Sequence, residues 1–275
     1  MGKIYMTACM KGGCAKTVTT YNLAYSLNEL GKKVLCADFD SRANLSTCFG
    51  MEDTAAVPVT IGHLMMAQIE DEELPDSEKY IQEQKGGDFI PSSMILSAVD
   101  AKLRLEMGAE KMLSSILEPL RDRYDAIIID TAPTLGALNI NALAATDEVI
   151  ITVNPQLLAM MGLQDFLKTV KKIKARVNER LLVAGILLNM CDARTNLCKV
   201  ITEQVCDTFD GQIRIFDSRI PNTVKVGESV YYSEPLIEYA PECNASKAYQ
   251  NLAKELIAYE AVSYTHLRAH ETAAN

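Results

Sequence analysis

A glycine-rich loop between an apolar strand and an amphipathic helix is the feature that most constrains the fold of this chain. The apolar run over residues 3–10 stops at this loop, and a helical pattern with one leucine face follows it. The loop reads Lys11-Gly12-Gly13-Cys14-Ala15-Lys16-Thr17. A loop in this position directs backbone N–H groups and the positive end of the helix at one point, an arrangement that binds phosphate.

The side chains of the loop suggest a nucleotide as the source of that phosphate. Lys16 would reach the β- and γ-phosphates as a point charge, and the hydroxyl of Thr17 would bind Mg²⁺. The remaining contacts would come from Gly12, Gly13, Cys14, Ala15 and Val18. The alternative is a plain glycine turn with a helix-capping Thr, which this context favours less.

Two carboxylates are expected at the same edge of the sheet as the loop. Asp40 follows the buried run over residues 33–37, and Asp130 ends the buried run over residues 126–129. Carboxyl ends of parallel strands meet at one edge, where open α/β sheets bind ligands. Asp38 is expected to serve structure, as a cap or in an ion pair.

The rest of the chain alternates strand and helix patterns. Further strands are expected at 148–153 and 181–188, helices at 61–69, 98–121 and 157–177, and an acidic excursion at 52–88. This order predicts an α/β fold with a doubly wound, mostly parallel sheet and helices on both faces. Residues 1–262 form one domain, while 263–275 (SYTHLRAHETAAN) look like vector or adapter sequence.

Composition limits where such a protein works. The net charge is −9, so nucleic-acid binding would need a local basic patch. The eight cysteines show no C-x-x-C pair and no zinc-ligand spacing, which indicates reduced thiols in a cytosolic setting. No apolar stretch reaches the ~18 residues of a membrane span, and no signal peptide is recognised.

Five segments in order resemble the deviant Walker A ATPases of the ParA/MinD family. They are Lys11 to Thr17, Asp38-Phe39-Asp40, Tyr124 to Asp130, Asp192-Ala193-Arg194-Thr195-Asn196-Leu197, and Ile220-Pro221 with Val224-Lys225. The resemblance covers the chain to about residue 262, and the D-A-R-T-N-L segment favours the ParA branch. It implies the P-loop NTPase fold, with ATP and Mg²⁺ as cofactors.

The resemblance also implies roles for single residues. Lys11 would reach the phosphates of a partner across an ATP-bound homodimer, and Lys16 and Asp40 would share in catalysis. Asp130 would hold Mg²⁺ through water with Thr17, beside Asp40, which positions the attacking water. Residues 131–136 match the second switch, with Ala132 as a mild departure. Asn189 and Pro221 match regions that hold adenine, although amide capping of a strand end is an equal alternative for Asn189.

The sequence departs from the family at informative places. Ala15 replaces the glycine before the P-loop lysine, and its methyl costs roughly 1 to 2 kcal/mol if the backbone there is left-handed. Ser41-Arg42-Ala43-Asn44 stands where Pro-Gln-Gly-Asn is usual. Arg194 and Lys225 match the non-specific DNA surface, but Asn222 stands where arginine is common. The basic face of the helix at 157–177 could equally be a solvated face.

Three functions remain open at this stage. The first is a ParA-like partition ATPase, nucleoid-associated when ATP-bound, that binds DNA non-specifically and is stimulated by a ParB-like partner. The second is a nucleotide-sensing dimer with little hydrolysis, which Ala15 favours. A MinD-like membrane switch ranks last, because the final helix lacks a strongly basic amphipathic end.

Overall fold

A parallel sheet runs through the centre of the molecule. The computed structural model describes residues 1–9, 12–134, 136–156, 159–192, 194–209 and 211–273, without the side chains of 159–161 and 260–273. Within these residues the sheet has seven strands in the order β3-β2-β4-β1-β5-β6-β7, and every neighbouring pair is parallel. The strands are β1 (Lys3–Ala8), β2 (Val34–Phe39), β3 (Asp88–Ile90), β4 (Ala126–Thr131), β5 (Glu148–Val153), β6 (Leu182–Cys191) and β7 (Ile215–Pro221).

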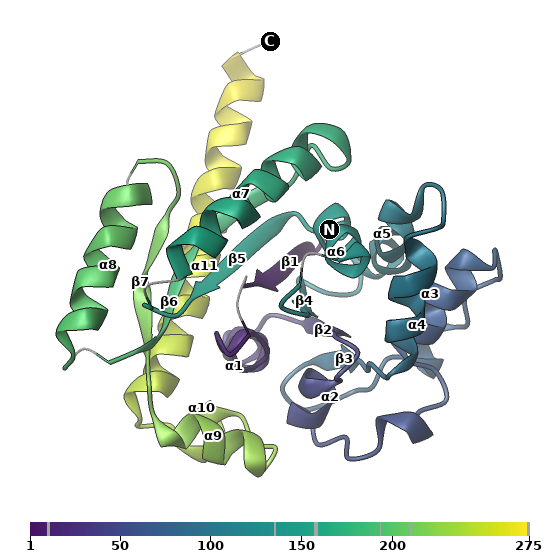
Figure 1. The fold of residues 1–275 in the computed structure, drawn as a ribbon, viewed down its shortest axis with the longest axis horizontal. Helices are drawn as coiled ribbons and strands as arrows, with labels where there is room; N and C mark the ends of the chain where they lie inside the picture. The colour runs from purple at the N-terminus through teal and green to yellow at the C-terminus, as the bar shows by residue number, and fades with distance from the viewer. Residues whose placement is uncertain (10–11, 135, 157–158, 193, 210, 274–275) are drawn as a thin grey trace.

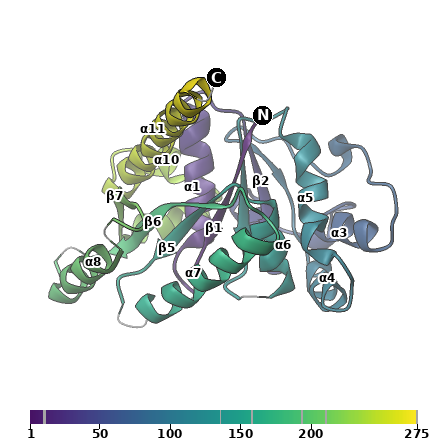
Figure 2. The same cartoon turned by 90° about the horizontal axis from the view of Figure 1, so that it is seen from above.

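Helices cover both faces of the sheet (Figures 1 and 2). One face carries α1 (Lys16–Glu29), α2 (Asn44–Cys48), α9 (Val224–Tyr231), α10 (Leu236–Tyr239) and α11 (Asn244–Ala273). The other carries α3 (Ile61–Ile69), α4 (Ile95–Leu103), α5 (Met112–Leu117), α6 (Ala137–Ala145), α7 (Ala159–Arg176) and α8 (Asn196–Phe209). The predicted doubly wound α/β class is confirmed.

Successive side chains of the central strands point to opposite faces of the sheet, so each face has its own hydrophobic core. In β1, Ile4 and Met6 join the core under α6, whereas Tyr5 joins the core under α1. The inner strands β2, β4 and β5 are buried on both sides because both sides are covered, which is why their sequences are continuously apolar rather than alternating.

Several elements differ from the sequence expectation. The helix expected over 98–121 is broken into α4, α5 and 3-10 turns at Ala109–Lys111 and Glu118–Leu120, with Gly108 left-handed at the break (φ 70°). The strand β7 was not predicted, because burial alternates along this edge strand and leaves Asp217 and Arg219 exposed. The short strand β3 was missed as well. The helix α11 continues through the segment 263–273.

The carboxyl ends of the inner strands bring polar residues together. In the sheet register, Asp130 of β4 lies opposite Thr7 of β1 on one side and Asp38 of β2 on the other. The loop from β1 to α1 starts at this same edge. The fold therefore places the expected carboxylates beside the glycine-rich loop.

Candidate nucleotide-binding site

The glycine-rich loop leads from β1 directly into α1. Gly13 has φ 81° and Ala15 has φ 55°, so the backbone turns through left-handed conformations on both sides of Cys14. The first turn of α1 has Ala15 as its N-cap residue, and no side chain among the described residues caps it. Its N–H groups therefore remain available to an anion, as in a phosphate loop. Lys11 lies outside the described residues.

Thr17 and Asp130 meet at the mouth of this loop. The Thr17 hydroxyl donates a 2.7 Å hydrogen bond to Oδ2 of Asp130, which is fully buried. The other carboxylate oxygen, Oδ1, has no hydrogen-bond partner among the described residues. Burial raises the pKa of Asp130 to about 6, against the lowering effects of the Thr17 hydrogen bond and the Lys16 charge. A buried oxygen without a partner is costly, and a hydrated cation at this point would satisfy it.

Lys16 lies beside the same carboxylate. Its side chain is on the buried first turn of α1, and the whole residue is only 7% exposed. Burial lowers the pKa of Lys16, while the carboxylates of Asp130 and Asp40 oppose that shift. The ammonium group is thus held near the helix N-terminus, where it can meet a phosphate rather than solvent.

Asp40 is engaged by the arginine two residues further on. Nη2 of Arg42 donates to Oδ2 of Asp40 at 2.7 Å, Nε reaches both carboxylate oxygens at 3.3 Å, and the Arg42 backbone N–H donates to Oδ1 at 3.0 Å. Asp40 is buried, whereas the Arg42 side chain is 58% exposed. Arg42 stands where the family usually has glutamine. The departure is visible in the sequence, but the contact of Arg42 with Asp40 is not.

Asp38 serves structure, as expected. Its carboxylate accepts hydrogen bonds from the backbone N–H and the hydroxyl of Ser46, at 2.8 and 2.7 Å, and from the Asp40 backbone N–H at 3.3 Å. These bonds fix the first turn of α2 against β2. Burial, followed by the charge of Asp130, raises the pKa of Asp38 to about 7.

Two alanines occupy left-handed positions where the family usually has glycine. Ala15 has φ 55° and ψ 35°, and Ala43 has φ 53° and ψ 35°. Both alanines immediately precede a helix, α1 and α2. A left-handed alanine costs roughly 1–2 kcal/mol. The condition that the sequence analysis attached to Ala15 is therefore met, and Ala43 carries the same strain.

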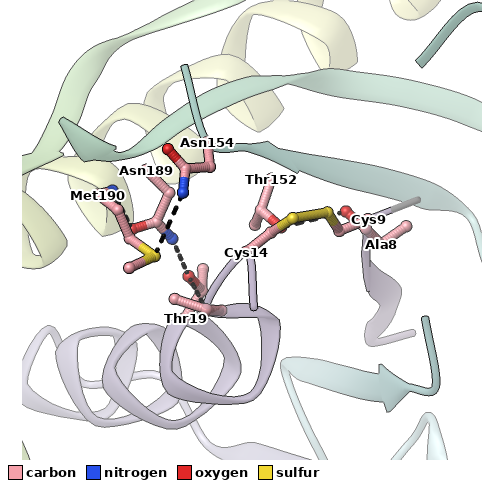
Figure 3. Close-up of a disulfide and its surroundings, with 9 residues drawn as sticks. Ala8, Cys9, Cys14, Thr19, Thr152, Asn154, Asn189 and Met190 are labelled. Carbon is pink, nitrogen blue, oxygen red and sulfur yellow. Dashed lines mark hydrogen bonds between the residues drawn. A yellow bond between two sulfur atoms is a disulfide. The ribbon is translucent and has the colours of Figure 1, made fainter. Parts of the chain in front are cut away.

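The two residues expected near adenine lie on neighbouring strands. Asn189 of β6 is buried, donates a 2.8 Å hydrogen bond to the Thr19 hydroxyl of α1, and accepts one from the Met190 backbone N–H (Figure 3). This pairing matches the alternative of a structural amide. Pro221 ends β7 and lines a cavity of 570 Å³ with residues of α8. A role of either residue in base binding stays a prediction.

The matched second switch follows β4. The Asn139 side chain of α6 donates to the backbone carbonyls of Ala132 (3.1 Å) and Thr134, which fixes residues 131–134 against that helix. Leu135 lies outside the described residues. This segment follows Asp130 directly, so a movement of the Asp130 carboxylate would be passed to α6 through only a few residues.

The candidate DNA contacts lie at the same edge, beyond β6 and β7. Arg194 is 89% exposed and pairs with Asp192 at 3.0 Å, and Lys225 is 48% exposed and pairs with Glu228 at 2.8 Å. Exposed pairs of this kind are worth about 0–1 kcal/mol, so they do not prevent either cation from meeting phosphate. The basic side chains of α7 are exposed as well: Lys168, Lys171, Lys172, Lys174 and Arg176.

Comparison with known proteins decides the family. A family model described as an AAA domain matches residues 2–183. The chain is 35% identical to the sporulation initiation inhibitor protein Soj of Bacillus subtilis, over 94% of this chain and 99% of that protein. It is 31% identical to the chromosome partitioning protein ParA of Caulobacter vibrioides, over 94% and 95% of the two chains. The chain belongs to the ParA/Soj family of P-loop ATPases.

Solved structures support the same fold for this family member. Cobyrinic acid a,c-diamide synthase from Mycobacterium smegmatis, with bound ATP analog and magnesium, superposes with a TM-score of 0.80 at 25% identity, covering 94% of this chain and 95% of that one. The cofactors ATP and Mg²⁺ that the sequence implied fit the loop, Lys16, Thr17 and Asp130 described above. In the described part of the chain, no helix is long and apolar enough to cross a membrane.

Proposed function

We propose that this ParA/Soj-family protein binds Mg-ATP at the β1–α1 loop and uses it to assemble a homodimer. The observation that carries the proposal is the contact of Thr17 with Asp130, whose second buried oxygen has no partner in the described residues. A hydroxyl and a carboxylate oxygen are the hard donors that Mg²⁺ prefers. In this proposal Thr17 and Asp130 hold the metal, with Asp40 beside it, and the metal neutralises phosphate charge.

The loop supplies the phosphate contacts in this proposal. Backbone N–H groups of Gly12 to Val18 surround the phosphates, and Lys16 adds a positive charge held between two carboxylates. Lys11, by resemblance, contributes its charge to the nucleotide of the partner protomer. A cation supplied in this way ties ATP binding to dimerisation.

Hydrolysis would depend on Asp40. By resemblance this carboxylate positions the attacking water, which requires an oxygen that is free to accept a hydrogen bond. In the structure both oxygens accept hydrogen bonds from the Arg42 side chain. We infer that turnover is slow until this ion pair is broken, and that a ParB-like partner or the second protomer is what breaks it.

A second candidate function is a nucleotide-sensing dimer that barely hydrolyses ATP. Two observations favour it: the left-handed Ala15 within the phosphate loop and the Arg42–Asp40 ion pair. Measured turnover with and without DNA and the product of the neighbouring gene discriminates between the two functions.

DNA is the proposed partner of the ATP-bound dimer. Arg194, Lys225 and the exposed lysines of α7 are the candidate contacts. The chain carries a net charge of −9, so a single protomer repels a polyanion overall. Dimerisation doubles the local positive patch, which is why we expect binding to need ATP. In such an account the protein acts in the bacterial cytosol and associates with the nucleoid, and its cargo is a plasmid, a mobile element or a chromosome.

Light scattering tests the proposed switch. ATP, but not ADP, should double the mass of the wild type, and Lys11→Ala should remove the effect while retaining nucleotide binding. Lys79→Ala, a surface lysine in the 3-10 turn Ser77–Lys79, is the matched control and should dimerise normally. A mass that ignores ATP in the wild type, or an unaltered ATP response in Lys11→Ala, would contradict the proposal.

A further inference from the structure

Two cysteines are joined across the base of the phosphate loop. Cys9 directly follows β1, and Cys14 lies in the loop two residues before Lys16. The structure links them in a disulfide with their Cα atoms 6.5 Å apart, within the span that a disulfide bridges (Figure 3). From the sequence we expected reduced thiols throughout, because the cysteines show no C-x-x-C pair and no zinc-ligand spacing. The other six cysteines are free.

The bridge lies beneath the loop rather than in the space above it. Cys9 is 8% exposed and Cys14 is 4% exposed, whereas Gly12 and Gly13 are exposed. A Cβ atom built on either glycine would meet no atom within 4 Å. The disulfide therefore ties Cys14 to the end of β1 and leaves the space beside Gly12 and Gly13 open.

The structure anchors both ends of the loop independently of the bridge. On one side, the Thr152 hydroxyl of β5 donates to the Ala8 carbonyl at the end of β1, at 3.3 Å. On the other, the Asn189 side chain donates to Thr19 in α1 at 2.8 Å (Figure 3). The segment between these anchors is the part whose conformation a crosslink can alter.

The loop segment around Cys14 contains left-handed backbone conformations, one of them at an alanine. Gly13 (φ 81°) and Ala15 (φ 55°) flank the bridged Cys14, and the alanine is strained in the left-handed region. Without a crosslink the loop has more backbone conformations open to it and must recover this one when it binds a phosphate. A crosslink at Cys14 removes many of the relaxed alternatives, and preorganisation of this kind raises affinity.

We propose that Cys9 and Cys14 form a redox-active dithiol site for thiol–disulfide exchange, and that its disulfide form binds Mg-nucleotide more tightly than its dithiol form. This inference rests on the proposed nucleotide site. In the reaction, the thiolate of one cysteine attacks a low-molecular-weight disulfide and releases one small thiol. The second cysteine then attacks the mixed disulfide and releases the other. One S–S bond forms in the protein as one breaks in the small disulfide, and both protein thiol protons pass to the released thiolates.

Thiol counting tests the first half of the proposal. The native full-length protein is equilibrated with oxidised or reduced glutathione, unfolded in denaturant that contains an alkylating agent so that buried thiols react, and mapped by mass spectrometry. We expect alkylation of all eight cysteines after reduction, and loss of label from Cys9 and Cys14 alone after oxidation. Label retained on both of these cysteines after oxidation, or a bridge between other cysteines, would overturn it.

Nucleotide affinity tests the second half. A fluorescent ADP analogue with Mg²⁺ is titrated into oxidised and reduced wild type, into Cys9→Ser, and into the control Cys206→Ser, whose thiol is half-buried in α8. We expect about fivefold tighter binding by oxidised wild type. Cys9→Ser should match the reduced wild type in both buffers, and Cys206→Ser should keep the redox response.

The possible results distinguish a failure of the redox inference from a failure of the proposed nucleotide binding. Equal or weaker affinity in the oxidised wild type would overturn the redox inference and leave the nucleotide site intact. A redox response retained in Cys9→Ser would overturn it as well. Failure of both redox forms to bind the analogue would instead contradict the proposed function.

Discussion

Thr17 and Asp130 are 113 residues apart in the chain, yet the hydroxyl of one donates a 2.7 Å hydrogen bond to the buried carboxylate of the other. The parallel sheet creates this contact, because β1 and β4 are neighbours whose carboxyl ends lie at one edge. The contact joins the helix that follows the phosphate loop to the strand that leads into the second switch.

The buried carboxylates predict how stability changes with pH. Burial raises the pKa of Asp130 to about 6 and that of Asp38 to about 7, above the ~3.9 of an unfolded aspartate. The folded chain therefore binds more protons than the unfolded chain between about pH 4 and 7, so its stability should fall as pH rises through this window and level off above it.

Denaturant unfolding of metal-free protein at several pH values checks this dependence. Asp130→Asn should reduce the decrease in unfolding free energy between about pH 4 and 7 by on the order of 1–3 kcal/mol. The surface substitution Asp122→Asn should leave this decrease unchanged. Metal-free stability that rises from pH 5 to 7, or the same slope in Asp130→Asn, would count against the environment described for this carboxylate.

Burial favours the protonated form of Asp130, and bound Mg²⁺ should favour the ionised form instead. A divalent cation favours the ionised carboxylate, so the Mg²⁺-dependent part of nucleotide affinity should increase from about pH 5 to 7. Titration of a fluorescent ADP analogue with and without Mg²⁺ across this range measures the effect. In Asp130→Asn the Mg²⁺-dependent increment should vanish, whereas an undiminished increment would place the metal elsewhere.

Replacing Ala15 with glycine should relieve strain in the loop. The left-handed methyl costs roughly 1–2 kcal/mol, and the added freedom of glycine in the unfolded chain offsets about half of the gain. We expect Ala15→Gly to raise the free energy of unfolding by about 0.5–1 kcal/mol and to tighten ATP binding by several-fold.

Ala43→Gly is the matched control for this substitution. It removes the same strain at φ 53° ahead of α2, so it should stabilise the fold similarly without tightening ATP binding to the same extent. Denaturation midpoints and ATP affinities of both variants separate the two effects. An Ala15→Gly protein that is less stable and binds ATP no better would show that the loop is not strained.

Breaking the Arg42–Asp40 pair should raise ATP turnover. Arg42→Gln restores the residue type usual in the family and removes the guanidinium from Asp40, which frees Oδ2 and leaves Oδ1 with the backbone N–H of residue 42. The Arg42 side chain is 58% exposed, so we expect a stability change of only about 0–1 kcal/mol. A steady-state phosphate-release assay should show a several-fold increase in kcat, and Arg104→Gln, which breaks an exposed pair with Asp100, should show none. Unchanged turnover in Arg42→Gln would indicate that this pair does not limit hydrolysis.

Much of the fold and the centre of the site were predictable from short-range patterns. The glycine loop identified the β1–α1 turn, and runs ending in aspartate identified β2 and β4, because buried parallel strands are continuously apolar. The same reasoning missed the edge strand β7, because its exposed Asp217 and Arg219 interrupt the apolar run. It also missed the break at Gly108, since a helical pattern on both sides does not reveal a left-handed residue between them.

Contacts between residues that belong to no recognised motif could not be predicted from the sequence. Neither the bonds from Arg42 to Asp40 nor the bond from Asn189 to Thr19 belongs to a motif. The first depends on the local conformation of the loop after β2, and the second on how β6 and α1 are placed. The Cys9–Cys14 bridge was hidden for the same reason, because spacing alone does not show that the loop folds back toward its strand. The family resemblance supplied the role expected of Lys11, which lies outside the described residues.

Titration of Mg-ATP into wild type and Lys16→Ala tests the central claim most directly. Lys16 is 7% exposed beside Asp130 and Asp40, so its removal takes the only side-chain charge that we assign to the phosphates from the protomer's own loop. We expect affinity to fall by about a hundredfold or more, as for loss of a charge-assisted contact in a buried site, while Lys79→Ala binds like wild type. Unchanged Mg-ATP affinity in a folded Lys16→Ala protein would contradict the assignment of this loop as the nucleotide site.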